Sequence, residues 1–170
     1  MPDGPARTAS AVSGVNHLAL TSGDIDRLAD FYVGVFGAEV LARSEGVPRK
    51  CVIRLAPGTS LHVFEVGFDE ARKPDDEPFD RGSINHFALE ARDPQTFAEV
   101  RARLVAAGRS DGGVYEQEGL YTLFATDPDG LFVEWTVRKV EGWRPPFATS
   151  PFVGLGQPAS AAADPGSATG

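Results

Sequence analysis

The chain is poor in cysteine, in net positive charge and in long hydrophobic runs. Cys51 is the single cysteine among 170 residues, so no disulfide can form within the chain. No apolar stretch approaches the ~20 residues that a membrane span needs, and the sequence does not open with the basic and then apolar pattern of a secretion signal. These absences predict a cytoplasmic protein that has no membrane partner.

The formal net charge of −8 argues against nucleic acid as a partner, because the phosphate backbone attracts basic proteins. Hydrophobic residues make up 42% of the chain, which is enough to build the core of one domain. Cys51 falls in the apolar run Cys51-Val52-Ile53, so we expect a buried, inert thiol rather than a nucleophile.

Both ends of the chain have the composition of disordered segments. Residues 1–12 show little periodicity and are predicted to form a disordered arm, and residues 141–170, rich in Pro, Ala, Gly and Ser, a mostly disordered tail. Phe147 and Phe152 are exceptions within this tail. They suggest that its first part docks onto the body of the protein or onto a partner subunit.

The folded domain, residues 13–140, contains a repeat. The segment Val15-Asn16-His17-Leu18-Ala19-Leu20 recurs as Ile84-Asn85-His86-Phe87-Ala88-Leu89, and each copy is followed by a helical pattern and three short strand patterns. The modules cover about 14–67 and 83–140, with a charged, Pro-containing linker between them. The predicted fold is therefore α+β: two paired β-α-β-β-β modules forming a curved, partly open barrel-like sheet with helices on its convex face.

Three histidines and one glutamate occupy matching positions in the two modules. His17 and His86 lie in the first strand of their modules, and His62 and Glu134 lie in the last. Side chains alternate between the two faces of a strand, which places all four on the face away from the helices and predicts a metal site. Glu65 competes with His62 for this role, but it lies on the opposite face unless a bulge shifts the strand.

The chemistry of these side chains narrows the choice of metal without settling it. Imidazole and carboxylate together suit Fe(II), Mn(II), Co(II), Ni(II) or Zn(II). An ionised Glu134 among Phe132, Val133 and Trp135 is costly to bury without a cation or another partner.

With these residues the chain resembles the vicinal oxygen chelate superfamily, which includes glyoxalase I, extradiol dioxygenases, methylmalonyl-CoA epimerase, fosfomycin-resistance enzymes and bleomycin-binding proteins. The resemblance spans roughly residues 14–140 and implies a divalent metal that binds two adjacent oxygens of a small-molecule substrate. It also implies a homodimer, with the site formed either within one chain or across two. The motifs that carry it are Asn16-His17-Leu18-Ala19-Leu20, Asp30-Phe31-Tyr32, Asn85-His86-Phe87-Ala88-Leu89, Asp127-Pro128-Asp129-Gly130 and Phe132-Val133-Glu134.

Within this superfamily, our first hypothesis is an Fe(II) ring-cleavage dioxygenase. His17, His86 and Glu134 match the metal ligands on the first, fifth and eighth strands, and His62 would act as an acid–base group near neutral pH. Dioxygenases of this type usually carry a tyrosine where this chain has Phe124. Tyr121 is the nearby catalytic candidate, although its strand parity is opposite.

Two alternatives remain open from the sequence. In a glyoxalase-type isomerase, lyase or epimerase all four residues, His62 included, would bind the metal and Glu134 would be a catalytic candidate. A non-enzymatic drug-binding resistance protein would share the fold without the metal.

Overall fold

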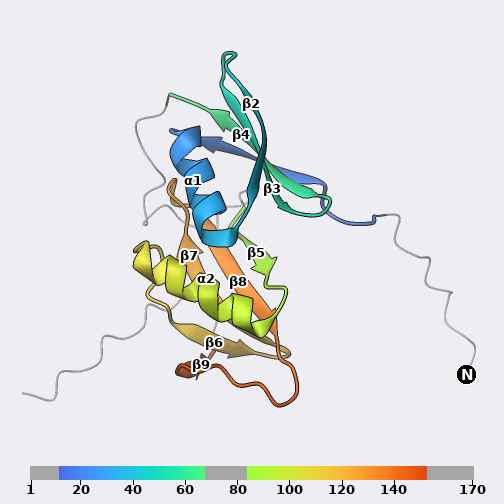
Figure 1. Ribbon diagram of the computed structural model, residues 1–170, viewed down its shortest axis with the longest axis vertical. Coiled ribbons are helices and arrows are strands. Elements are labelled where there is room, and N and C mark those ends of the chain that lie inside the picture. Colours follow the sequence, from blue (N-terminus) through green and yellow to red (C-terminus); the bar gives the residue numbers. More distant parts are fainter. Residues whose placement is uncertain (1–11, 68–83, 153–170) are drawn as a thin grey trace, which may run out of the picture.

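The computed structural model describes residues 12–67 and 84–152, which form two modules of one helix and a small sheet each (Figure 1). The first module consists of β1 (His17–Ser22), α1 (Ile25–Phe36), β2 (Glu39–Ser44), β3 (Lys50–Ala56) and β4 (Thr59–Glu65). The second consists of β5 (His86–Glu90), α2 (Pro94–Ala106), β6 (Val114–Gln117), β7 (Leu120–Thr126), β8 (Phe132–Arg138) and β9 (Thr149–Pro151).

Each module builds its own mixed sheet. The first has the strand order β1-β4-β3-β2 and the second β5-β8-β7-β6-β9, and in both the first strand runs parallel to the module's fourth strand. No strand of one sheet pairs with a strand of the other in the described residues, so the two sheets do not close into a barrel. The predicted α+β fold of paired β-α-β-β-β modules, partly open, is confirmed.

Local signals in the sequence set the helix ends. Asp24 caps α1 by accepting hydrogen bonds from the backbone N–H groups of Asp26 and Arg27, and Gly37 ends that helix with φ 72°. Asp93 caps α2 through the N–H of Thr96, and proline occupies the first helical position. Both helices begin where the caps predict. Neither helix, nor any other in the described part of the chain, is long and apolar enough to cross a membrane.

The apolar core lies between each sheet and its helix. Leu18, Leu20, Phe87 and Leu89 pack against this core, while His17 and Ala19 on the alternate positions of β1 are exposed. Cys51 is also in the core, and burial raises the pKa of its thiol, as expected of an inert cysteine. The core therefore occupies one face of each sheet and leaves the other face open.

The segment that follows β8 docks onto the body of the protein, as Phe147 and Phe152 suggest. Residues 149–151 form β9, which pairs in parallel with β6, and Phe147 packs against the core near Phe97. The two phenylalanines that interrupt the polar composition are thus the residues that dock this segment. Residues 1–11, the linker 68–83 and residues 153–170 lie outside the described part of the chain.

The turn between β7 and β8 joins the two modules. Asp127 is buried, and its Oδ1 accepts hydrogen bonds from the N–H groups of Asp129 and Leu131, while Tyr32 of α1 donates to its Oδ2 (3.2 Å). Burial raises the pKa of Asp127 in spite of these donors, and burial next to this carboxylate raises that of Tyr32. The turn is therefore an interior polar contact between modules.

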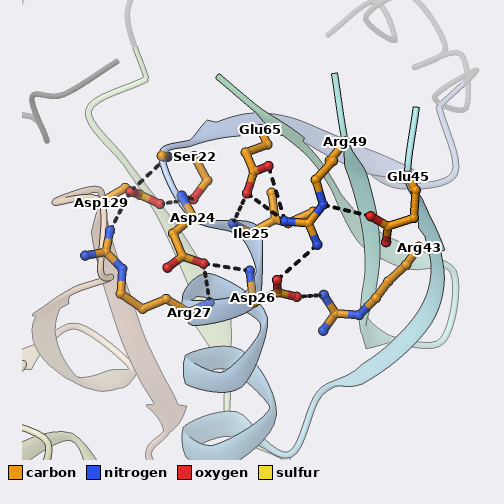
Figure 2. Close-up of polar contacts among 11 residues, drawn as sticks. Ser22, Asp24, Ile25, Asp26, Arg27, Arg43, Glu45, Arg49, Glu65 and Asp129 are labelled. Carbon is orange, nitrogen blue, oxygen red and sulfur yellow. Dashed lines mark hydrogen bonds and ion pairs between the residues drawn. The ribbon is translucent and has the colours of Figure 1, made fainter. Parts of the chain in front are cut away.

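Asp129 extends the same contact at the surface. Its carboxylate accepts from the hydroxyl of Ser22 (2.6 Å) and pairs with Arg27 (3.0 Å), so the first module's β1–α1 corner holds the second module's turn (Figure 2). Phe36 and Trp135 add an edge-to-face ring contact at 5.5 Å between the modules.

We expect Asp127→Ala to lower the free energy of unfolding by about 2 kcal/mol, because it leaves the buried Tyr32 hydroxyl and two backbone N–H groups without their acceptor. Asp127→Asn keeps one oxygen to accept from the two backbone N–H groups and loses only the acceptor of Tyr32, so it should cost less. Urea denaturation measures both, with Glu118→Ala in the exposed β6–β7 turn as a control expected within about 0.5 kcal/mol of wild type. Equal losses for the Ala and Asn variants would mean that the charge, rather than the hydrogen bonds, anchors the turn.

Candidate metal centre

The first pair of predicted ligands, His17 and His62, meets on the open face of the first sheet. β1 and β4 run in parallel with Ala19 opposite His62, so His17 lies one pleat away on the same face. The two imidazole rings stack with centroids 4.1 Å apart and planes 8° from parallel. This places two nitrogen donors side by side.

Each repeated Asn-His dipeptide orients its imidazole in the same way. His17 Nδ1 is 2.8 Å from Asn16 Oδ1, and His86 Nδ1 is 2.6 Å from Asn85 Oδ1. An amide oxygen only accepts hydrogen bonds, so each of these two contacts is satisfied by the tautomer that carries its proton on Nδ1. This is the tautomer that a metal ligand bound through Nε2 requires.

The second pair of predicted ligands lies on the open face of the second sheet. His86 Nε2 is 3.1 Å from Glu134 Oε2, and the side chains of His86 and Glu134 are 28% and 12% exposed. The other carboxylate oxygen, Oε1, accepts hydrogen bonds from the hydroxyl of Thr122 (2.7 Å) and the amide of Gln117 (3.2 Å). One oxygen of Glu134 is thus fixed by neutral donors and the other lies beside an imidazole.

Sequence reasoning did not find Thr122 and Gln117. The signal for Thr122 is the antiparallel pairing of β7 with β8, which places it on the same face as Glu134. Gln117 lies on β6, one strand further from Glu134, and nothing in its local sequence marks it.

The structure brings the four predicted ligands together as two pairs rather than as one cluster. Within residues 12–67 and 84–152 of a single chain, no three His, Cys, Asp or Glu side chains form a group that could hold a metal ion. The pairs lie on separate sheets, and Figure 1 shows the sheet of the first module in the upper part and that of the second in the lower part. Each sheet therefore carries two of the four predicted ligands.

Glu65, the alternative to His62, has a structural role instead. Its carboxylate accepts hydrogen bonds from Arg49 (3.1 Å) and from the backbone N–H of Ile25 at the start of α1 (3.4 Å), on the helix side of the sheet (Figure 2). Arg49 also bonds Asp26, and this contact lowers the pKa of Asp26. β4 has no bulge between His62 and Glu65 in its pairing with β1, so the two residues face opposite sides.

Tyr121, predicted as a catalytic candidate, does not lie at either pair. Its side chain is 1% exposed and packs edge-to-face on Trp143 with centroids 5.5 Å apart, on the core side of β7. The strand alternation that places Thr122 beside Glu134 turns Tyr121 away. The residue on the open face is Phe124, whose ring lies 6.2 Å from the ring of His86.

Comparison with known proteins identifies the family of this chain. The sequence model of the Glyoxalase/Bleomycin resistance protein/Dioxygenase superfamily matches residues 14–135. The chain belongs to this superfamily. The match contains all four predicted ligands and ends just after Glu134, before β9.

Two curated relatives carry the name lactoylglutathione lyase, one of them as a putative enzyme. Lactoylglutathione lyase GLX1 of Arabidopsis thaliana is 30% identical over 128 residues, which cover 72% of this chain and 43% of the plant protein. A putative lactoylglutathione lyase of Brassica oleracea var. gemmifera is 31% identical over the same shares of the two chains. The chain thus spans less than half the length of the curated relatives that it matches.

Solved structures share the fold. A glyoxylase/bleomycin resistance protein/dioxygenase domain from Frankia sp. EAN1pec superposes with a TM-score of 0.64 at 20% identity, covering 76% of this chain and 100% of that one. Lactoylglutathione lyase from Agrobacterium tumefaciens superposes with a TM-score of 0.56 at 25% identity, covering 79% and 100%.

We expect Glu65→Ala to lower the free energy of unfolding by about 1 kcal/mol, since it removes a charged acceptor from Arg49 and from the start of α1. His62→Ala, on the open face, should change it by less than about 0.5 kcal/mol. Urea denaturation of the two variants in parallel measures this difference. The reverse order would identify His62 as a packing residue and weaken its place in the site.

Proposed function

We propose that this protein is a divalent-metal-dependent enzyme of the glyoxalase type, active as a homodimer. Each metal centre would combine His17 and His62 of one chain with His86 and Glu134 of a second copy. The observation that carries this proposal is that each sheet presents two donors side by side on an open face, and that no third donor joins either pair in the described part of one chain. Closed twofold pairing would create two equivalent centres, because each chain supplies both halves.

The donors fit a divalent transition metal. The histidines with an Asn neighbour present Nε2, and Glu134 is a mostly buried carboxylate that keeps one oxygen beside His86. Three imidazoles and one carboxylate suit Fe(II), Mn(II), Co(II), Ni(II) or Zn(II). When bound, such a cation supplies Lewis-acid stabilisation to two adjacent oxygens of a small substrate.

The chain's own residues would orient the donors and handle the proton. Asn16 and Asn85 would favour the Nδ1-protonated tautomers of His17 and His86, and Thr122 with Gln117 holds Oε1 of Glu134. Oε2 of Glu134 would bind the metal at rest and would accept a proton from a substrate carbon once it is released from the metal. Thr122 and Gln117 are positioning residues, because they act through Glu134.

Two observations favour a lyase or isomerase over the dioxygenase of our first hypothesis. The open face carries Phe124 where ring-cleavage dioxygenases of this superfamily usually have tyrosine, and Tyr121 faces the core. The curated relatives at 30% identity are lactoylglutathione lyases. A dioxygenase with His62 as acid–base group is the second candidate, supported by the two-histidine-one-carboxylate donor set itself.

The arrangement across two chains predicts complementation between inactive variants. The double variants H17A/H62A and H86A/E134A should each lose tight binding of Zn(II) or Ni(II), since each keeps only one pair of donors. When the two variants are co-expressed, half of the dimers are mixed and each mixed dimer has one intact centre. The mixture should therefore bind about a quarter of the wild-type metal, measured by elemental analysis after loading and buffer exchange.

The control replaces one double variant by the quadruple variant that lacks all four donors, which should restore nothing. If wild type binds metal but the co-expressed double variants bind none, the metal site lies within one chain. Wild-type content well below roughly half an equivalent after loading would overturn the metal enzyme and favour a non-enzymatic binding protein.

The reaction class predicts activity toward the hemithioacetals that α-ketoaldehydes such as methylglyoxal or phenylglyoxal form with glutathione. Metal-loaded protein should convert them to the α-hydroxy thioester, measured as a rise in thioester absorbance. At equal metal content, Glu134→Gln should slow this rise at least about 100-fold, because the amide cannot accept the proton. Oxygen uptake with a panel of catechols under Fe(II) would support the dioxygenase instead. If neither reaction occurs with metal-loaded protein, the substrate class is wrong while the metal result stands.

A further inference from the structure

We propose that Tyr115, Phe124 and Phe152 form an aromatic subsite that receives a planar aromatic group of the substrate, beside the His86–Glu134 pair. The inference rests on the proposed function, because it treats that pair as half of an active centre. It adds a substrate class, since the ligand would carry an aromatic ring next to its two adjacent oxygens.

The three rings make a continuous surface that begins at the predicted ligands. Phe124 lies perpendicular to His86 with centroids 6.2 Å apart, and in the sheet it is directly opposite Glu134. The ring of Tyr115 is 6.1 Å from that of Phe124, and the ring of Phe152 is 5.9 Å from Phe124 and 6.2 Å from Tyr115. A substrate held at His86 and Glu134 would therefore extend over these rings.

These aromatic residues are separate from the packed interior. None of the three belongs to the core cluster, which lies on the other face of the second sheet around Phe97 and Trp135. Each is half-buried in the single chain, so part of each ring is accessible. Aromatic rings at such spacings favour a further ring in offset or edge-to-face contact, and a cluster on an open face has room for one.

Phe152 lies on a segment beyond the residues that match the superfamily. The superfamily match ends at residue 135, whereas β9 pairs with β6 at the edge of the second sheet (Figure 1). Phe152 is fixed just after β9 by a hydrogen bond from its backbone N–H to the carbonyl of Glu116 (3.0 Å), and the Thr149 hydroxyl bonds the Glu116 side chain. The last described residues thus contribute one wall of the subsite.

Two small chelators that differ by a phenyl group test this proposal. Acetohydroxamate and benzohydroxamate both offer two adjacent oxygens to a metal, but only benzohydroxamate carries a ring. With Co(II)-loaded protein, whose metal content is measured first, calorimetry should show benzohydroxamate binding about tenfold more tightly than acetohydroxamate.

Phe152→Ala should remove most of that preference and leave the affinity for acetohydroxamate unchanged, whereas Phe152→Tyr should keep it. Phe124→Leu, which retains apolar volume, is a second variant that should also reduce the preference. Circular dichroism and sedimentation confirm that each variant keeps the fold and the oligomeric state. If Phe152→Ala has the same ratio of benzohydroxamate to acetohydroxamate affinity as wild type, the subsite is overturned. It is also overturned if the ratio falls only in variants whose oligomeric state has changed.

A metal-free arm separates this inference from the proposed function. Saturation-transfer NMR should detect the phenyl protons of benzohydroxamate on the metal-free wild type and lose that signal with Phe152→Ala. If the metal-free wild type gives no phenyl signal, the three rings do not bind the phenyl group on their own and the subsite is overturned. If metal binding fails while the phenyl signal depends on Phe152, the metal enzyme is wrong and the aromatic subsite stands.

Discussion

Strand alternation is the constraint on which this molecule depends. In β1, β5 and β8 every second side chain packs under a helix, so the intervening side chains must face the open side of the sheet. A shift of one residue in any of these strands would bury a histidine or the glutamate in the core and expose the apolar residues that hold the helix. The same register therefore stabilises the fold and places the donors.

The polar contacts divide between these two faces. On the helix side, Glu65 accepts hydrogen bonds from Arg49 and from the start of α1, which joins elements within the first module. Asp127 accepts a hydrogen bond from Tyr32, which joins the two modules. On the open side, the contacts of Glu134 leave one carboxylate oxygen beside an imidazole. The face from which a carboxylate projects thus determines its role: Glu65 and Asp127 stabilise the fold, and Glu134 lies at the candidate site.

Much of the fold could be predicted from the sequence, because its signals are local. The duplicated Asn-His strands, the Asp24 and Asp93 caps and the apolar parity set the elements and the face of each ligand. Two features depend on contacts between distant segments and have no local signal: the neighbours of Glu134 and the separation of the ligands into two pairs. The docking of the segment around β9 had a signal in Phe147 and Phe152, but its pairing with β6 did not. Tyr121 was predicted as a catalytic residue because it is close in sequence to Phe124, but it points to the core face of β7 and is therefore not at the candidate site.

The short strand β9 also determines how the second sheet ends. An uncovered edge offers unpaired N–H and C=O groups to any passing extended chain, which is a route to aggregation. β9 covers the edge of β6, and its last residue, Pro151, has no N–H to donate to a further strand. A further strand on that side could pair only with the three-residue edge of β9, which Pro151 interrupts, so continuation of the backbone ladder is disfavoured there.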